Sequence, residues 1–254
     1  GLENNPNALA ITMAIGICCI LYKINLKKQV YAIFAFLTIG MMFYAIVLTG
    51  SRKSLIGILI VLFYWLFFVI NKEIKLLKTS DKIKSFFVVL LIIGIGGNIL
   101  YSYFEESILF WRLSVLFAEG QESRETMYLM ALELFEQNPI IGVGLDNYRD
   151  VSGINLYSHS TYAEALSCTG VIGSLFYFTP YLTLLYKLFK IVNNKETSYL
   201  LLKQAGVMLG LLILLIFLAI GIIHFYEITS SIAFGIIIAF CSLNKKKKYS
   251  NNRI

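Results

Sequence analysis

The chain has 254 residues, of which 58% are hydrophobic and 15% are charged, and its mean hydropathy is +0.74. This composition excludes a soluble globular protein, a disordered chain, a coiled coil and a secreted disulfide scaffold, and it indicates an all-α integral membrane protein. The net charge of +7 is better explained by basic loops facing the cytoplasm than by nucleic acid, which we do not expect as a partner.

About seven apolar segments can each cross a bilayer as a helix. They cover residues 8–22, 30–49, 54–71, 85–103, 162–186, 199–223 and 228–243. We expect residues 1–254 to form a single membrane domain. The first residue is Gly1 and no signal peptide precedes the first apolar run, so we interpret the chain as a fragment of a larger domain whose earlier spans are missing. The four cysteines lie in or beside apolar segments without metal-ligand spacing.

The loops between these segments alternate in charge. Most of the 22 basic residues fall after the first, third, fifth and seventh segments, as in the Lys72–Lys84 loop and the Lys245–Lys248 tail. The other loops carry few cations, namely Arg52, Lys53, Arg112, Arg124 and Arg149. The positive-inside rule therefore puts the lysine-rich loops in the cytoplasm, and it puts the N-terminus, the turn at 50–53, the loop 104–161 and the turn at 224–227 outside.

Residues 104–161 form a long extracytoplasmic loop that contains one amphipathic helix. Met127, Met130, Ala131, Leu134 and Phe135 recur at helical spacing, while three glutamates fall on the other side. A plausible N-cap precedes this helix at Ser123, and Asn138-Pro139 ends it. We expect the helix to lie on the membrane or to cap the bundle.

Two arginines are candidate phosphate ligands. Arg124 lies in the first turn of the loop helix on its apolar face, where free N–H groups favour anions. Arg52 lies in the short turn Thr49-Gly50-Ser51-Arg52-Lys53. Either arginine could instead extend along apolar surface to anchor the chain at the interface. Arg149 is a further cation of the outer loop and completes the predicted substrate-binding arginines.

His159 stands just before the fifth apolar segment and is the candidate catalytic base. A helix N-terminus disfavours the imidazolium, and a neutral imidazole can accept a proton near pH 7. The alternative is an interfacial histidine bonded to a loop carbonyl. Glu164 is a candidate substrate ligand, but Thr161 and Glu164 also match a capping box. For His224 and Glu227 in the last outer turn, interfacial bonding is the favoured interpretation. Gly142 and Gly144 indicate a tight turn rather than a dinucleotide site.

Several motifs occur in a fixed order along the chain. They are Asn5-Pro6-Asn7-Ala8-Leu9-Ala10, Thr49-Gly50-Ser51-Arg52, Arg124 on the loop helix, Asn138-Pro139-Ile140-Ile141-Gly142-Val143-Gly144, and His159-Ser160 leading to Thr169-Gly170-Val171-Ile172-Gly173. This ordered set resembles the O-antigen ligase and O-antigen polymerase superfamily over nearly the whole chain. The chain departs from the family pattern at Ser160, where Asn is frequent, and at Cys168, where an acidic residue is frequent, which leaves Glu164 as the carboxylate nearest to the histidine.

The resemblance implies an integral membrane glycosyltransferase with a fold of the C type, active without cofactor or metal. Its donor would be a glycan on undecaprenyl diphosphate at the outer face of the cytoplasmic membrane, with Arg52 and Arg124 on the diphosphate and His159 as the base or acceptor-positioning residue. A flippase and a chain-length regulator are further expected partners. No Asp-x-Asp pair occurs in the sequence, which agrees with a metal-free reaction.

Four functions remain open on the sequence. The first is a polymerase that joins lipid-linked repeat units into capsular, O-antigen or exopolysaccharide chains, and the second is a ligase that transfers the glycan to lipid A core. The third is a transporter, which the scarcity of ionisable residues at the centres of the spans disfavours. The fourth is a non-catalytic scaffold.

Overall fold

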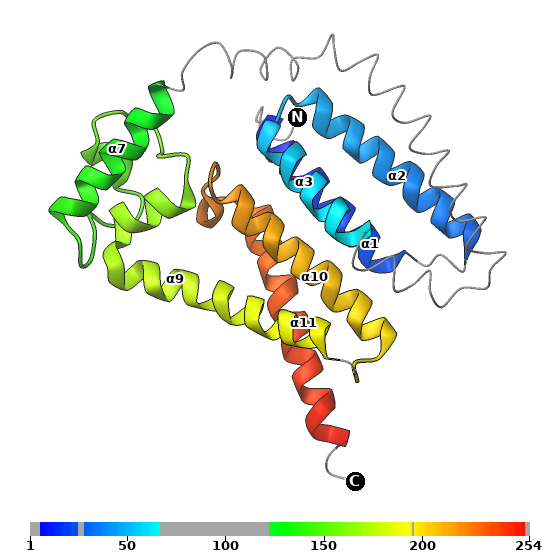
Figure 1. Cartoon of the computed structure of the whole chain (residues 1–254). Helices are drawn as coiled ribbons and strands as arrows, with labels where there is room; N and C mark the ends of the chain where they lie inside the picture. Colours follow the sequence, from blue (N-terminus) through cyan, green and yellow to red (C-terminus); the bar gives the residue numbers. More distant parts are fainter. Residues whose placement is uncertain (1–5, 25–27, 67–121, 195, 252–254) are drawn as a thin grey trace. The chain divides into compact units, whose positions relative to one another are not determined.

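The computed structural model of the protein describes residues 6–24, 28–66, 122–194 and 196–251 (Figure 1). These ranges contain helices and no strand, so the predicted all-α class is confirmed for them. The helices are α1 (Pro6–Lys23), α2 (Gln29–Leu48), α3 (Arg52–Tyr64), α7 (Glu122–Gln137), α8 (Tyr148–Val151), α9 (Thr161–Asn193), α10 (Tyr199–Leu218), the 3-10 helix η3 (His224–Tyr226) and α11 (Ile228–Asn251). The expected span 85–103, the Lys72–Lys84 loop and the first part of the outer loop lie outside the described residues.

Four of these helices are long and apolar enough to cross a membrane, and they cover Pro6–Lys23, Val30–Leu48, Thr161–Asn193 and Tyr199–Leu218. A shorter apolar helix follows at Ile228–Asn244. Large apolar side chains of α2 are exposed, among them Tyr31 at 71% and Met41 at 73%, as expected for a helix that faces lipid. The protein is therefore a helical membrane protein, and the number of seven spans stays a prediction.

The chain divides into two compact units. The first comprises Gly1–Ala118 and Lys190–Leu214, and so holds α1, α2, α3 and most of α10. In this unit α1 packs against both α2 and α3. The buried residues of α1 recur every three or four positions, which puts them on one side of the helix. They are Ala10, Ile11, Ala14, Ile17, Cys18 and Leu21.

Small residues allow close helix packing inside the first unit. Gly16 of α1 lies against Met42 of α2, because a Cβ at Gly16 would stand 3.2 Å from the methionine Cε. Gly210 of α10 lies against α3, where a Cβ would stand 3.4 Å from Val61 Cγ1. Such contacts are typical of membrane helices, where side-chain packing rather than the hydrophobic effect holds helices together.

Lys203 is a buried cation of α10, only 5% exposed. Its Nζ donates a hydrogen bond to the carbonyl oxygen of Ile24, just after the end of α1. The last carbonyls of a helix have no partner within the helix and carry partial negative charge. Lys203 therefore caps α1 and ties it to α10, which explains a lysine within an apolar helix.

The second unit comprises Glu119–Phe189 and Leu215–Ile254. Its helix α7 buries Met127, Ala131 and Leu134, which confirms the predicted amphipathic helix. These residues face Tyr148 of α8, which is fully buried and donates its hydroxyl to the carbonyl oxygen of Met127 at 2.8 Å. The start of α7 differs from the sequence prediction, because the helix begins at Glu122 and Ser123 belongs to its first turn rather than capping it.

A break in α9 receives the glycine-rich loop that follows α7. Gly170 interrupts α9 with φ of 60° and ψ of −164°. The freed N–H groups of Val171 and Ile172 bond to the carbonyl oxygens of Pro139 and Ile140 at 2.8 and 3.2 Å. In the opposite direction, the N–H groups of Val143 and Gly144 bond to carbonyls of α9 on the other side of the break. Loop and broken helix therefore form one backbone-bonded structure.

The beginning of α9 is joined to the turn between α10 and α11. The N–H of Thr161 bonds to the carbonyl oxygen of Ala219 at 2.8 Å, and its hydroxyl bonds to that of Ile222 at 2.6 Å. The same hydroxyl accepts the N–H of His224 at 3.0 Å. Further along, Tyr181 of α9 stacks on Phe234 of α11 at 4.2 Å between ring centroids.

Candidate functional site

His159 stands at the tip of a tight turn whose flanking residues are buried. Ser158 is fully buried and Ser160 is 6% exposed, whereas His159 is exposed. The Ser158 hydroxyl bonds to the carbonyl oxygen of Ser160 at 3.1 Å, across the histidine. His159 has φ of 57°, in the left-handed region that non-glycine residues rarely adopt. The turn therefore presents the imidazole outward on a fixed backbone.

Left-handed backbone recurs in this loop. Its other two non-glycine examples among the described residues are Asp146, with φ of 61°, and Asn155, with φ of 58°. Asn, Asp and His are the residue types that tolerate this region best. Since strained backbone concentrates at functional sites, these residues support a functional interpretation of the loop.

Glu164 fixes the His159 turn and does not form the predicted capping box. Its Oε2 accepts the N–H of Ser158 at 2.9 Å. The helix begins at Thr161, so Ser160 is the cap residue, and its hydroxyl accepts the N–H of Ala163 at 3.4 Å. The capping-box interpretation is wrong because the Thr161 hydroxyl is engaged by the turn after α10 instead.

Arg149 belongs to the second unit and is paired with Asp146. One guanidinium nitrogen lies 3.1 and 3.2 Å from the two carboxylate oxygens of Asp146. The guanidinium carbon stands 4.4 Å from the ring centroid of Tyr157. Burial and the charge of Asp146 raise the pKa of Tyr157, so this phenol remains protonated at neutral pH. Because Asp146 already offsets its charge, Arg149 is less suited to a diphosphate than an arginine without a carboxylate partner.

The side chain of Tyr148 is fully buried in this part of the second unit. Burial, together with the negative charge of the Glu164 carboxylate, raises the pKa of Tyr148 to about 12. The phenol therefore stays neutral and keeps its bond to α7 at any physiological pH. Tyr148 thus holds α7, α8 and the start of α9 in one arrangement.

Arg52 occupies the first position of α3, after a turn that requires glycine. Gly50 has φ of 66°, and the N–H of Ser51 bonds to the hydroxyl of Thr49 at 3.3 Å. Ser51 precedes α3 but makes no side-chain cap; its hydroxyl donates to Ser54 at 3.0 Å. The half-buried Arg52 is thus placed at a helix N-terminus, the position that favours anions.

Arg124 belongs to the first turn of α7, as predicted, and its side chain lies outside the described residues. By helical spacing, position 124 falls on the same face as Met127 and Ala131. Arg124, Arg149, His159 and Glu164 all belong to the second unit, and Arg52 belongs to the first. The structure joins Glu164 to the residue before His159, through the N–H of Ser158, and a joint role of the two units stays a prediction.

His224 is structural, in agreement with the sequence interpretation of the last outer turn. It is 2% exposed, and both ring nitrogens are bonded. Nε2 lies 2.6 Å from the carbonyl oxygen of Leu215, so it carries the proton, and Nδ1 accepts the hydroxyl of Ser230 at 2.8 Å. Burial lowers the pKa of His224, although its bond to Leu215 acts in the opposite direction.

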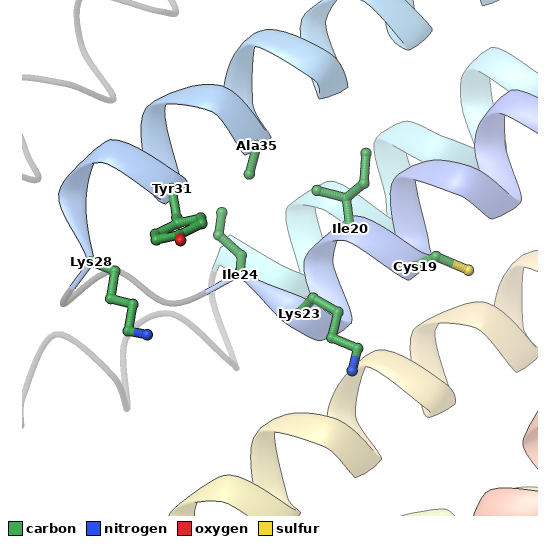
Figure 2. A pocket seen from close by; sticks show the side chains of 7 residues that line it. All are labelled: Cys19, Ile20, Lys23, Ile24, Lys28, Tyr31 and Ala35. Atoms are coloured by element: carbon green, nitrogen blue, oxygen red, sulfur yellow. The ribbon is translucent and has the colours of Figure 1, made fainter.

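A cavity of about 530 Å³ lies between α1 and α2 in the first unit. Figure 2 shows Lys28 near Tyr31 on α2 and Lys23 near Ile24 at the end of α1, with Ile20, Cys19 and Ala35 as the other lining residues. Arg52 follows the other end of α2, a 20-residue helix whose length is therefore about 30 Å. None of the predicted site residues is among those that line this cavity.

The architecture defines a helical membrane protein whose loop displays a histidine from a tight, backbone-bonded turn. A protein-family model described as O-antigen ligase matches residues 37–178, more than half of the chain. The chain belongs to the O-antigen ligase family, whose members are glycosyltransferase-like enzymes of surface polysaccharide assembly. Comparison with curated proteins gave no match.

The sequence did not reveal the break in α9 or the anchoring of the His159 turn. One signal was present for the break, since Gly170 and Gly173 lie in a helix that propensity would disfavour at these positions. The two serines around His159 were a second signal, because Ser hydroxyls commonly bond to nearby backbone in turns.

Proposed function

We propose that this chain is a membrane glycosyltransferase that polymerises oligosaccharide repeat units linked to undecaprenyl diphosphate, on the outer face of the cytoplasmic membrane. The observation that carries the proposal is the family match across residues 37–178, which spans Arg52, Arg124 and His159. The exposed, backbone-anchored position of His159 supports a role in chemistry rather than in packing.

The three residues have two roles, one shared by the arginines and one that belongs to the histidine. Arg52 and Arg124 each occupy the first turn of a helix, where the backbone favours anions, and they bind the donor diphosphate. His159 accepts the proton of the acceptor hydroxyl or orients that hydroxyl. Two guanidinium groups on the diphosphate make it a better leaving group, because they match the charge that develops as the bond breaks.

The reaction is a substitution at the anomeric carbon of the donor sugar. The acceptor oxygen forms the new glycosidic bond, and the bond between the anomeric carbon and the diphosphate oxygen breaks. Its electron pair leaves with undecaprenyl diphosphate, and the hydroxyl proton passes to the imidazole of His159. Neither an oxidant nor a reductant is required.

Alanine variants of the three residues test these roles. Arg52→Ala, Arg124→Ala and His159→Ala are each expected to lower the rate of polymer formation by about 10²-fold or more, since removal of a general base or of one charge-stabilising donor has such effects. The measurement is polymer length and amount, from purified protein in vesicles with lipid-linked repeat units. Lys187→Ala, an exposed lysine of α9, serves as the control. Full-length polymer from all three variants at the normal rate would refute the assignment.

Ligation to lipid A core is the second candidate, and the description of the matching family model, O-antigen ligase, favours it. The two activities share the donor and differ in the acceptor. Offering the purified protein lipid-linked repeat units in one reaction and lipid A core in another separates them. A ligase transfers glycan only to the lipid A core, whereas a polymerase lengthens the lipid-linked chain without it.

A further inference from the structure

The cavity between α1 and α2 combines two cations with apolar walls. Lys23 of α1 and Lys28, which precedes α2, line it beside Tyr31 (Figure 2). The rest of its lining is mostly apolar and includes Ile20 and Ile24. Its volume of about 530 Å³ lies within the range of small-molecule binding sites. The proposed glycosyl transfer uses none of these residues, so the cavity is open to a second function.

The two lysines form no ion pair with the residues that the structure describes. Glu196 is the one acidic residue in the described part of the first unit. The ammonium nitrogen of Lys28 lies 5.6 Å from the ring centroid of Tyr31, and that of Lys23 lies 5.9 Å from the ring centroid of Tyr22. Each lysine thus contacts an aromatic ring rather than a carboxylate, so its positive charge is available to an anion.

The backbone at this end of α2 also favours an anion. The helix begins at Gln29, and Lys28 at its N-cap position makes no side-chain hydrogen bond to it. The first N–H groups of a helix have no partner within the helix and carry partial positive charge. On the opposite wall, Lys203 of α10 bonds to the carbonyl oxygen of Ile24, which fixes the end of α1 where it lines the cavity. The cavity, the two lysines and the helix start therefore combine into a site for an anionic group.

An exposed apolar stripe along α2 indicates that the anion is part of a lipid. Phe34, Leu37 and Met41 are exposed and follow Tyr31 in steps of three or four residues, which puts them along one side of the helix. In a membrane such a stripe meets acyl chains. A free phosphate contacts none of this apolar surface. A phospholipid uses both features, because its headgroup fits the lysines while one acyl chain follows the stripe.

We propose that Lys23 and Lys28, with Tyr31 beside them, bind the phosphate headgroup of an anionic phospholipid between α1 and α2. Basic pockets between membrane helices are known to bind such headgroups. The positive-inside rule puts this end of α2 at the cytoplasmic leaflet, and Arg52 follows the opposite end of the helix, about 30 Å away. The lipid site is therefore distinct from the donor site, and it does not depend on the proposed function.

Displacement of a fluorescent phosphatidylglycerol from the full chain in neutral detergent tests the proposal. Unlabelled phosphatidylglycerol should displace the probe, and zwitterionic phosphatidylcholine should do so about tenfold less well. Inorganic phosphate, the other source of the same anion, should not displace it. Displacement by phosphate as effective as that by the lipid would overturn the assignment to a phospholipid. Equal displacement by the two lipids would show that the site does not recognise negative charge.

A double variant that combines Lys23→Gln and Lys28→Gln tests the two cations. It should bind phosphatidylglycerol about 30-fold more weakly, because each lysine near an anionic headgroup contributes a factor of about five. The matched control combines Lys187→Gln and Lys190→Gln, which remove the same charge from α9 outside the cavity, and it should bind like the wild type. An equal loss in the two double variants would reveal a general effect of net charge and exclude a specific site.

The variant Ala35→Phe tests the cavity itself, because it adds a ring to the wall and keeps both lysines. It should weaken binding about tenfold, as expected when a packed site is overfilled, whereas Ile33→Phe, on the same helix but outside the lining, should not. Thermal unfolding without added lipid establishes that each variant is folded. If the double lysine variant does not fold, Lys28→Gln alone, with an expected loss of about fivefold, and Ala35→Phe decide the question. Wild-type affinity in Ala35→Phe would mean that the lipid binds elsewhere, and the proposal would then be wrong.

Discussion

At the scale of single residues, the two histidines of the chain have opposite environments. His159 is exposed at a turn, and His224 is buried with both nitrogens bonded. The interpretation of His224 as a bonded, non-catalytic residue is confirmed, whereas the catalytic role of His159 stays a prediction. Spacing along the sequence could not supply the bonds that keep His224 neutral, which come from Leu215 and Ser230.

The buried His224 predicts a dependence of stability on pH. Its pKa in the folded protein lies below the ordinary value of 6.5, so the unfolded chain binds a proton first as the pH falls. The contribution to stability is therefore present above pH 6.5 and is lost as the pH falls from there towards the folded-state pKa. The melting temperature in detergent should decrease from pH 7.5 to pH 5.5.

Substitution of this histidine checks the prediction. His224→Gln should flatten the pH dependence of the melting temperature. An equally steep dependence in His224→Gln would show that a different group is responsible.

Thr161 and Glu164 show why residue patterns mislead. Their spacing matches a capping box, but both side chains form other bonds. Thr161 bonds to residues 61 and 63 positions later in the sequence, and Glu164 bonds back to Ser158. Local spacing contains no information about such distant partners, so the role of Glu164 in the His159 turn could not be predicted.

At the scale of elements, Gly142 is fixed by the broken helix α9. A Cβ at Gly142 would stand 2.3 Å from the backbone carbon of Cys168, and its φ of 69° is itself unfavourable for other residues. Gly153 has the same φ of 69° but open space around it. Alanine substitutions at Gly142 and Gly153 therefore separate the cost of left-handed backbone, which both variants share, from the cost of a steric clash, which only Gly142 has.

Gly142→Ala is expected to destabilise the protein more than Gly153→Ala. Left-handed backbone costs about 1–2 kcal/mol in both variants, and the clash adds roughly 1–3 kcal/mol only in the first. Thermal unfolding in detergent measures the difference. Equal losses in the two variants would mean that the loop does not dock on the broken helix in solution.

A helix could be predicted from the sequence where the spacing of its apolar residues is enough to indicate it. The loop helix was found because Met127, Ala131 and Leu134 recur at helical spacing and do form its buried side. The break at Gly170 was missed because its N–H groups find their partners in Pro139 and Ile140, about 30 residues earlier. Hydropathy therefore predicts one continuous helix for the fifth apolar segment, although α9 contains a kink at Gly170.

At the scale of the whole molecule, hydropathy predicted the helical membrane class, and four predicted spans correspond to described helices of sufficient length. The predicted span 199–223 ends early, at Leu218, because the chain turns there to meet the start of α9. Hydropathy along the sequence gives the length of an apolar segment. It does not give the residue at which the helix ends so that the following turn can bond to another helix.

The predicted orientation is tested by single cysteines at Asp150 and Glu196, both exposed. The natural cysteines Cys18, Cys19, Cys168 and Cys241 are first replaced by serine or alanine. Asp150→Cys should react with a membrane-impermeant maleimide in intact cells, and Glu196→Cys only after permeabilisation, because the positive-inside rule puts the lysine-rich loops in the cytoplasm. The reverse labelling pattern would invert the membrane topology and exclude an outer active site.

The bonds from the start of α9 to residues 219–224 also impose an order on biosynthesis. During translation Thr161 emerges long before the carbonyls that it binds, so this junction closes only when the following helix has been made. If translation stopped after Asn193, the chain would contain Thr161 but not the residues to which it bonds. The start of α9, which follows the His159 turn, is therefore tied in place only after the turn that follows α10 has been made.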